Sequence, residues 1–440
     1  MIKNKINEPK WLALSFIAVI FCGSILLYLP WASQSGYTPY IDCLFAATSA
    51  TCVTGLVPVE TATHWSLFGH IVILLLIQIG GLGVMSFAVF YALVAGRKIH
   101  LRQRLVMQQA INLAEVGGVV RLFRYLLGFT FAAEGIGAII LALRWSGEMG
   151  WGKALWFGLF HSVSAFNNAG FDLMGGFKSL TGYTSDITVN LVISTLIIMG
   201  GLGFIVTYEL YHYRANRKLS LHSKVVLLTT GILLLVGTLL LFAGEYDHAL
   251  KDLPFGTKLL AAYFQSVTPR TAGFNTIDLT SLHLSSQLVI IMLMLIGASP
   301  GSTGGGIKTS TFAILWLAIY SQLRGKKDTE IFKRRIDTPD VMQALTIFLL
   351  FSLTMVVMTY LVSLSFPHGD LVDIAFEVAS ALGTVGLTLG LTPELTTLAK
   401  VFLVITMFLG RVGPLTIGFA LAFKEKQPDI HWPKGKIMVG

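Results

Sequence analysis

Apolar runs of about 20 residues recur along the whole chain and constrain its fold more than any other feature. Each is long enough to cross the roughly 30 Å hydrocarbon core of a bilayer. The runs lie near 12–30, 69–95, 122–143, 189–211, 225–243, 287–320, 341–364 and 400–422. Only 12% of the residues are charged, whereas a soluble domain carries about a quarter. The sequence therefore predicts an all-α polytopic membrane protein with eight transmembrane helices.

The basic residues indicate how these spans are oriented. An even number of spans places both termini on one side, together with the connectors 96–121, 212–224 and 321–340. Most of the 32 Lys and Arg residues lie on this side. Because Lys and Arg concentrate in cytoplasmic loops, we expect both termini in the cytoplasm. The formal net charge of +9 then reflects topology, and we expect a lipid bilayer and no nucleic acid as partner.

Four copies of one short pattern lie between the spans. They are "FAATSATCVTGLV" (45–57), "FHSVSAFNNAGFD" (160–172), "FQSVTPRTAGFN" (264–275) and "FEVASALGTVGLT" (376–388). Each begins with Phe, continues through small and hydroxyl residues, and reaches a glycine followed by Leu or Phe. A segment too short to span a membrane lies ahead of each glycine, at 40–50, 152–165, 254–268 and 370–382. The repeating unit is a span, a re-entrant half-helix, an extended segment with glycine, and a second span.

This periodicity predicts four pseudo-repeats around one pore. They cover 1–95, 96–211, 212–320 and 321–440, the last with a cytoplasmic tail. Non-helical backbone at membrane depth is tolerated where it is buried in protein or lines water, and rings of carbonyl oxygens replace the hydration shell of a cation. Glycine accommodates the positive φ that turns carbonyls toward an axis. The alternative, glycines that only allow close helix packing, has to account for four matching positions.

The predicted selectivity filter consists of four filter segments of three residues each. They are Val53, Thr54, Gly55; Asn168, Ala169, Gly170; Thr271, Ala272, Gly273; and Thr384, Val385, Gly386. None of these residues is a carboxylate, so the ion would meet backbone oxygens. The ten histidines show no metal-ligand spacing, and potassium at the filter is the only metal ion expected.

The sixth apolar run is interrupted by "GASPGSTGGGIKTS", 297–310. A proline and five glycines make a continuous helix costly here, by about 3 kcal/mol for the proline and about 1 kcal/mol per glycine. The segment partly matches a phosphate-binding pattern, but no strand precedes it, which argues against nucleotide binding on this chain. We predict instead a flexible loop beneath the filter, the gate loop, that blocks or clears the ion path. Its candidate residues are Gly297, Ala298, Ser299, Pro300, Gly301, Gly304, Gly305, Gly306 and Lys308.

Two arginines are predicted at membrane depth. Arg411 lies mid-way along the last run, in "MFLGRVGPLTIG", and a buried guanidinium normally faces a cavity or a partner. It is predicted either to act with the gate loop as a positive barrier to cations, or to pair with Glu134 or with gate-loop carbonyls. Arg270 immediately precedes the third filter segment and is expected to anchor this loop through an acidic neighbour such as Glu377. The glycines of "GGLG" at 80–83 and 200–203 are expected to permit bends or tight packing.

These motifs resemble those of the Trk/Ktr/HKT superfamily of potassium transporters. The pore-loop repeats, with "TAGFNTID" in the third and "GASPGSTGGGIKTST" after it, are most similar to the membrane subunits of bacterial Ktr systems. The likeness covers about 11–423. One departure is Asn167–Asn168 before the second filter glycine, although asparagine tolerates left-handed backbone.

The resemblance implies a bacterial plasma-membrane protein that transports K⁺ and is activated by Na⁺. It further implies a homodimer with one pore in each protomer. A cytosolic ring of RCK-type, KtrA-like subunits would bind ATP or ADP and control transport. The gate loop and Arg411 correspond to the positions that form the intramembrane gate in this family.

Potassium uptake through a regulated, channel-like pore is therefore the predicted function. The alternative is a sodium-coupled secondary transporter of another small solute. That class expects two inverted halves and one or two discontinuous helices, whereas this chain has four parallel copies. An enzyme is not expected, because no GxSxG, HExxH or paired-aspartate pattern lies at membrane depth.

Overall fold

The computed structural model describes residues 8–83, 119–326 and 328–413. Most of these residues are helical, in agreement with the predicted all-α class. The longer helices are α1 (Glu8–Tyr28), α4 (Leu67–Leu82), α7 (Val119–Met149), α9 (Ile187–Gly201), α12 (Leu221–Glu245), α14 (Leu284–Leu295), α15 (Thr309–Leu323), α16 (Thr338–Ser365) and α18 (Thr397–Val412).

Four shorter helices occupy the segments predicted as half-helices. They are α2 (Tyr40–Cys52), α8 (Trp151–Phe166), α13 (Phe255–Val267) and α17 (Leu371–Gly383). The connections contain α3 (Thr61–His64), η1 (Thr181–Tyr183), α10 (Phe204–Tyr211), α11 (Tyr213–Asn216), η2 (Thr392–Glu394) and the hairpin of β1 (Thr329–Ile331) with β2 (Arg334–Ile336).

Several helices are apolar enough to lie in a bilayer. Within the described residues, α7, α12 and α16 are each long enough to span it alone, and α9 with α10 forms a fourth candidate that is bent by 104°. The apolar part of α1, together with α4, α14 and α15, is shorter. The second and eighth predicted spans continue into 84–95 and 414–422, outside the described residues, so the count of eight stays a prediction.

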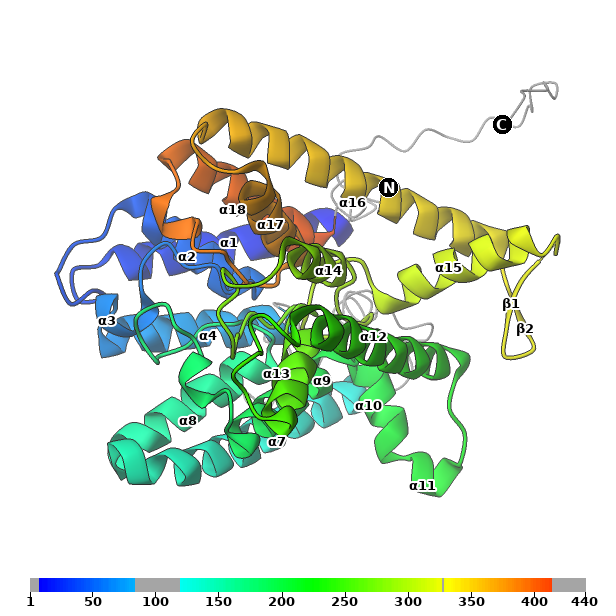
Figure 1. Cartoon of the computed structure of the whole chain (residues 1–440), viewed down its shortest axis with the longest axis horizontal. Helices are drawn as coiled ribbons and strands as arrows, with labels where there is room; N and C mark the ends of the chain where they lie inside the picture. Colours follow the sequence, from blue (N-terminus) through cyan, green and yellow to red (C-terminus); the bar gives the residue numbers. More distant parts are fainter. Residues whose placement is uncertain (1–7, 84–118, 327, 414–440) are drawn as a thin grey trace, which may run out of the picture.

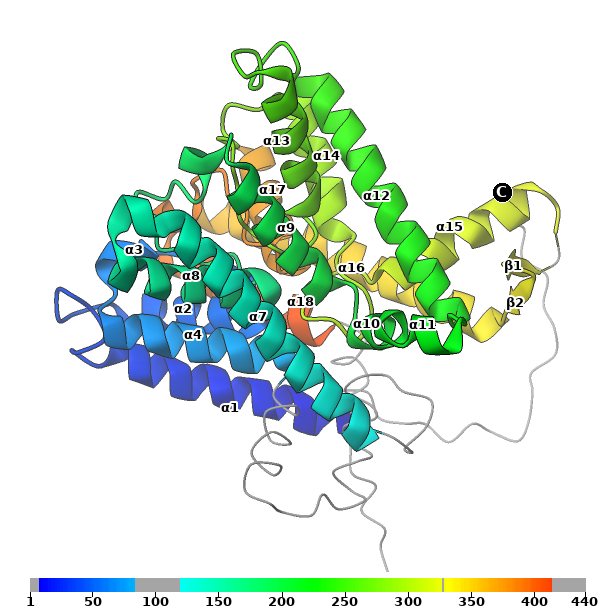
Figure 2. The same ribbon diagram turned by 90° about the horizontal axis from the view of Figure 1, so that it is seen from below.

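The helices pack in four groups that follow one another in a circle: α1 to α4, α7 to α9, α12 to α14, and α16 to α18. Within a group, a short helix contacts the longer helices around it, as α2 contacts α1 and α4. Between groups, the trailing helix of one packs on the short helix of the next: α4 on α8, α9 on α13, α14 on α17, and α18 back on α2. Figures 1 and 2 show the groups in colour order, from blue α1–α4 to gold and orange α16–α18. The exact repeat boundaries stay a prediction.

The interior and the exterior of this arrangement are both apolar. The phenylalanine that opens each copy of the repeated pattern is fully buried, at Phe45, Phe160, Phe264 and Phe376. In contrast, α12 and α16 expose long rows of leucine and other apolar side chains, among them Leu235, Leu239, Leu349, Leu353 and Val356. Soluble proteins rarely expose such wide apolar surfaces, whereas hydrocarbon surrounds them without cost.

A buried ion pair joins the fourth group to the first. Lys400 Nζ, on α18, lies 2.7 Å from Asp42 Oδ1, on α2, and only 10% and 11% of the two side chains are exposed. Removal of one partner from such a pair costs about 3–5 kcal/mol, because the other charge is left buried and unpaired.

Lys400→Met is therefore expected to lower the thermal unfolding midpoint of the purified protein, and adding Asp42→Asn is expected to restore much of it. Fluorescence-detected thermal unfolding in detergent measures both. Lys326→Met is the control, since Lys326 and Glu330 form an exposed pair at 3.4 Å, and such pairs contribute at most about 1 kcal/mol. An equal loss in the control, or no recovery in the double variant, would contradict the prediction.

Candidate ion pathway

The four filter segments, far apart in the chain, meet in a closed ring. Each glycine faces the backbone carbonyl of the residue that precedes the next repeat's glycine. In order around the ring, the neighbours are Gly55 with Ala169, Gly170 with Ala272, Gly273 with Val385, and Gly386 with Thr54. A Cβ added at Gly55 or Gly273 would come within 2.5 Å of the neighbouring carbonyl oxygen. The backbones therefore approach closely around one centre, and side chains are excluded there.

The backbone of each filter segment has the same handedness pattern. The first residue is left-handed, with φ of 57° at Val53, 60° at Asn168, 75° at Thr271 and 52° at Thr384. The glycine at the third position also has positive φ, between 71° and 96°, and the middle residue does not. Along an ordinary strand, successive carbonyls point to opposite sides. The change in the sign of φ from one filter residue to the next instead turns successive carbonyls to the same side. Left-handed residues other than glycine cost about 1–2 kcal/mol each, which the surrounding contacts must offset.

Hydroxyl side chains at the ends of the short helices brace this backbone. Ser49 Oγ accepts the N–H of Gly55, and Ser380 Oγ accepts that of Gly386, both at 3.0 Å. In the other two repeats the hydroxyl instead donates to the carbonyl of the residue after the glycine, from Ser164 to Phe171 and from Thr268 to Phe274.

Sequence reasoning did not single out these four residues as functional. The signal is present, however, because a serine or threonine stands six residues before the glycine in three copies and five before it in the third. The bond from the middle filter residue's N–H to the same hydroxyl residue's carbonyl is also repeated in all four copies, at 2.8–2.9 Å.

The first and fourth short helices end immediately before their filter segments, the second ends one residue earlier, and the third is separated from its segment by the turn residues 268–270. The last helical residues are Cys52, Phe166, Val267 and Gly383. The unpaired carbonyls at a helix C-terminus carry a partial negative charge. Four such ends gathered at one ring create a region of negative potential without any carboxylate, and this suits a weakly held cation.

The gate loop lies directly against the helix-end side of this ring. The Gly305 N–H donates to Thr384 Oγ1 at 3.1 Å, and a Cβ added at Gly304 would overlap the side chain of Thr271. Thr271 and Thr384 are the first residues of the third and fourth filter segments. The loop therefore contacts the third and fourth filter segments at their ends opposite to the glycines, and its role as a gate stays a prediction.

Backbone hydrogen bonds hold the gate loop in one folded position. Its ends form a parallel bridge between Ile296 and Ile307. Ser299 N–H donates to Gly201 O at 3.0 Å, and Thr303 N–H donates to Gly200 O at 3.2 Å. Both acceptors end α9, where the chain bends by 104°, which confirms the bend expected at this GGLG motif. The other predicted loop residues lie in the same segment between α14 and α15. They are Gly297, Ala298, Pro300, Gly301, Gly304, Gly305 and Gly306.

Two basic side chains donate hydrogen bonds to carbonyl oxygens of the gate loop. Lys308 Nζ donates to Gly304 O at 2.6 Å. Arg411 donates through Nη1 to Thr303 O and through Nη2 to Gly80 O, at the end of α4. The guanidinium thus joins the gate loop to the first and fourth helix groups. Of the predicted partners, gate-loop carbonyls are the ones it contacts, while Glu134 accepts a hydrogen bond from Asn167 at 2.8 Å.

The repeats explain why a side chain reaches this place. The glycines Gly80, Gly200 and Gly410 pack against carbonyls at the ends of α2, α8 and α17. The residue after each is Gly81, Gly201 and Arg411. Arg411 therefore fills a position beneath the ring that two other repeats leave without a side chain.

The prediction that Glu377 is the partner of Arg270 is wrong. Arg270 Nη2 donates to Thr230 Oγ1 on α12 at 3.4 Å, whereas Glu377 accepts a hydrogen bond from Thr392. An additional turn after α13, formed by residues 268–272, directs Arg270 toward the longer helix of its own group. Glu377 lies on α17, in the next group.

A circle of lipid-facing helix groups around a ring of backbone carbonyls defines a membrane transport protein. The chain belongs to the TrkH family of cation transport proteins, whose model matches residues 8–431.

Individual relatives match over nearly the whole length. The chain is 43% identical to the Ktr system potassium uptake protein B of Bacillus subtilis, over 99% of this chain and 97% of that protein. It is 41% identical to the potassium/sodium uptake protein NtpJ of Enterococcus hirae, over 100% and 98%. The crystal structure of the potassium transporter TrkH from Vibrio parahaemolyticus has a TM-score of 0.74 and 18% identity, over 96% of this chain and 86% of that one.

Proposed function

We propose that this protein takes up K⁺ across the plasma membrane through the ring of filter segments. The observation that carries the proposal is the closure of the ring, in which each of the four glycines faces a carbonyl of the next repeat. Twelve filter residues supply backbone and hydroxyl oxygens and no carboxylate, and such oxygens replace the water around a monovalent cation.

Discrimination between K⁺ and Na⁺ is proposed to be moderate. Each filter segment has one glycine and the four segments differ in sequence. In tetrameric K⁺ channels, by contrast, the filter consists of four identical TVGYG loops. One relative at 41% identity is named a potassium/sodium uptake protein, which supports some passage of Na⁺. Activation by Na⁺ is part of the proposal.

The gate loop and Arg411 are proposed to close the path beneath the filter. In support, the loop contacts Thr271 and Thr384 and is held by Arg411. Helix α15 begins at Thr309, within the last two residues of the interrupting segment 297–310, and leads to the charged β1–β2 hairpin. Figure 2 shows this hairpin at the far end of α15, where a partner could move the helix and the loop together.

The partner is proposed to be a cytosolic ring of RCK-type subunits that bind ATP or ADP, acting on a homodimer of this chain. The relatives named as components of a Ktr system support a partner subunit. The proposed orientation places both termini and the hairpin in the cytoplasm, in agreement with the concentration of Lys and Arg there.

Ion flux into proteoliposomes tests this function. The purified chain is expected to carry K⁺ or rubidium down its gradient without a Na⁺ gradient, and a nucleotide-loaded regulatory ring is expected to change the rate. Empty vesicles are the control. Flux that appears only with an imposed Na⁺ gradient and another solute would instead favour the sodium-coupled secondary transporter.

A further inference from the structure

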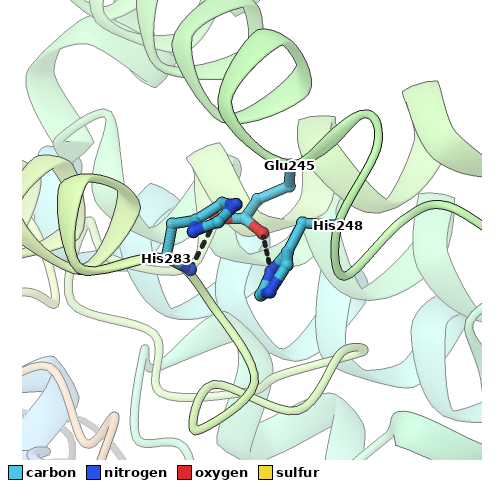
Figure 3. Close-up of side chains that lie close together, drawn as sticks. All are labelled: Glu245, His248 and His283. Atoms are coloured by element: carbon cyan, nitrogen blue, oxygen red, sulfur yellow. Dashed lines mark hydrogen bonds and ion pairs between the residues drawn. The ribbon is translucent and has the colours of Figure 1, made fainter.

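A cluster of metal-binding side chains lies outside the proposed ion pathway, at the end of the third repeat's long helix. Glu245 is the last residue of α12, and His248 follows in the next turn. His283 immediately precedes α14. Figure 3 shows the three side chains lying close together. Glu245 and His248 come from the start of the α12–α13 connection, and His283 comes from the end of the α13–α14 connection. Their potential ligand atoms all lie within 4.8 Å of one another.

The carboxylate at the centre of this cluster is fixed in place. Glu245 is buried, with 1% of the residue exposed. Its Oε1 accepts the backbone N–H of His283 at 2.9 Å, and its Oε2 accepts that of Ala249 at 3.4 Å. Each oxygen has a second lone pair, so these bonds orient the carboxylate and leave it able to bind a cation.

The two imidazoles stack beside this carboxylate. The rings of His248 and His283 have centroids 3.7 Å apart with 26° between their planes, and His248 Nδ1 lies 3.2 Å from Glu245 Oε2. Both histidines are exposed, so an ion can reach them from solvent. The cluster therefore offers two imidazole nitrogens and one buried, oriented carboxylate as ligands for a metal ion.

We propose that Glu245, His248 and His283 bind a divalent transition metal of the Zn²⁺ class. Two imidazole nitrogens and a carboxylate oxygen are three of the four ligands in one common type of zinc site, where water is the fourth. Mg²⁺ and Ca²⁺ prefer oxygen ligands and would find only one carboxylate. Tetrahedral ligands at about 2.0–2.1 Å from zinc are roughly 3.4 Å apart, whereas the ligand atoms here lie within 4.8 Å of one another. The exposed histidine rings, which are stacked, therefore have to separate and turn toward the ion when it binds.

The site would fasten the outer connections of the third repeat to each other. His283 ends the segment that returns from Gly273, and Glu245 ends the long helix against which α13 packs. A bound ion would therefore cross-link the two connections on either side of the third half-helix and filter segment. The histidines are 35 positions apart in the sequence, and only the fold brings them together.

Isothermal titration of the metal-free, detergent-purified chain with Zn²⁺ tests the proposal. One ion per chain is expected to bind at the cluster, and His248→Ala and His283→Ala are each expected to weaken its dissociation constant tenfold or more. The control is His368→Ala, an exposed histidine between α16 and α17 in the corresponding connection of the fourth repeat, which is expected to leave the constant unchanged. Glu245 is retained, because its carboxylate also holds the backbone.

Two further measurements keep the test decisive. Co²⁺ is expected to show the visible absorption of a tetrahedral site in the wild type and not in the His248→Ala, His283→Ala double variant. Size-exclusion chromatography checks that each variant is folded. Equal Zn²⁺ affinity in wild type and double variant would overturn the proposal, as would equal weakening by His368→Ala or displacement of Zn²⁺ by equimolar Ca²⁺.

Discussion

Serine in place of Gly55 is expected to reduce the K⁺/Na⁺ flux ratio by about tenfold or more, equivalent to at least roughly 1.4 kcal/mol of selectivity. An added Cβ would lie 2.5 Å from the Ala169 carbonyl oxygen, at a backbone φ of +96° that side chains rarely adopt. The neighbouring carbonyl has to move, and the spacing that replaces the ion's hydration shell is lost. Potassium and sodium fluxes into proteoliposomes, measured separately, give the ratio.

Gly390→Ser is the matched control for this substitution. Gly390 has nearly the same φ, +95°, but an added Cβ would have no heavy atom within 4 Å. It therefore reproduces the backbone strain of the first variant in open space, four residues after the filter glycine Gly386. An unchanged ratio in Gly55→Ser, or an equal loss in Gly390→Ser, would remove the ring from its proposed role.

The half-helices were predictable because lipid imposes a simple rule on length. A segment of 10–15 apolar residues between two full spans cannot cross the bilayer, and its repetition four times leaves little freedom in where it lies. The segment predicted at 40–50 is helical over Tyr40–Cys52, and the one at 370–382 is helical over Leu371–Gly383. The interruption of the sixth apolar run between α14 and α15 followed from a similar rule, the high cost of proline and glycine in a helix.

Side-chain partners were less predictable, because they depend on small rotations between helices. Arg270 turns toward Thr230 on α12 and away from Glu377, owing to one additional turn after α13. The β1–β2 hairpin had no sequence signal either. Its two-residue turn places Phe332 and Lys333 at φ of 49° and 61°, where asparagine and glycine are the usual residues.

Alanine in place of Arg411 is expected to increase K⁺ flux about tenfold and to make it less dependent on the regulatory ring. The guanidinium donates to Thr303 O in the gate loop and to Gly80 O, and a hydrogen bond from a charged group contributes about 1.5–3 kcal/mol. Loss of one such bond is enough to shift a closed–open equilibrium about tenfold toward the open loop. Removal of the positive charge beneath the filter lowers the barrier to cations in the same direction. Proteoliposome flux with and without the ring measures both effects.

Two companion variants separate the guanidinium's contacts from its charge and from general damage. Arg411→Lys keeps the charge but has no planar fork with which to hold two carbonyls at once, so an intermediate flux is expected. Arg324→Ala removes an arginine at the exposed end of α15, and its flux in the absence of the ring is expected to match the wild type. Deletion of 302–304, which removes the Thr303 carbonyl itself, is expected to reproduce the Arg411→Ala flux and to add nothing when the two changes are combined. If Arg411→Ala yields folded protein with unaltered flux, the arginine does not close the path; if it yields no assembled protein while Arg411→Lys does, its contribution is to hold three helix groups together.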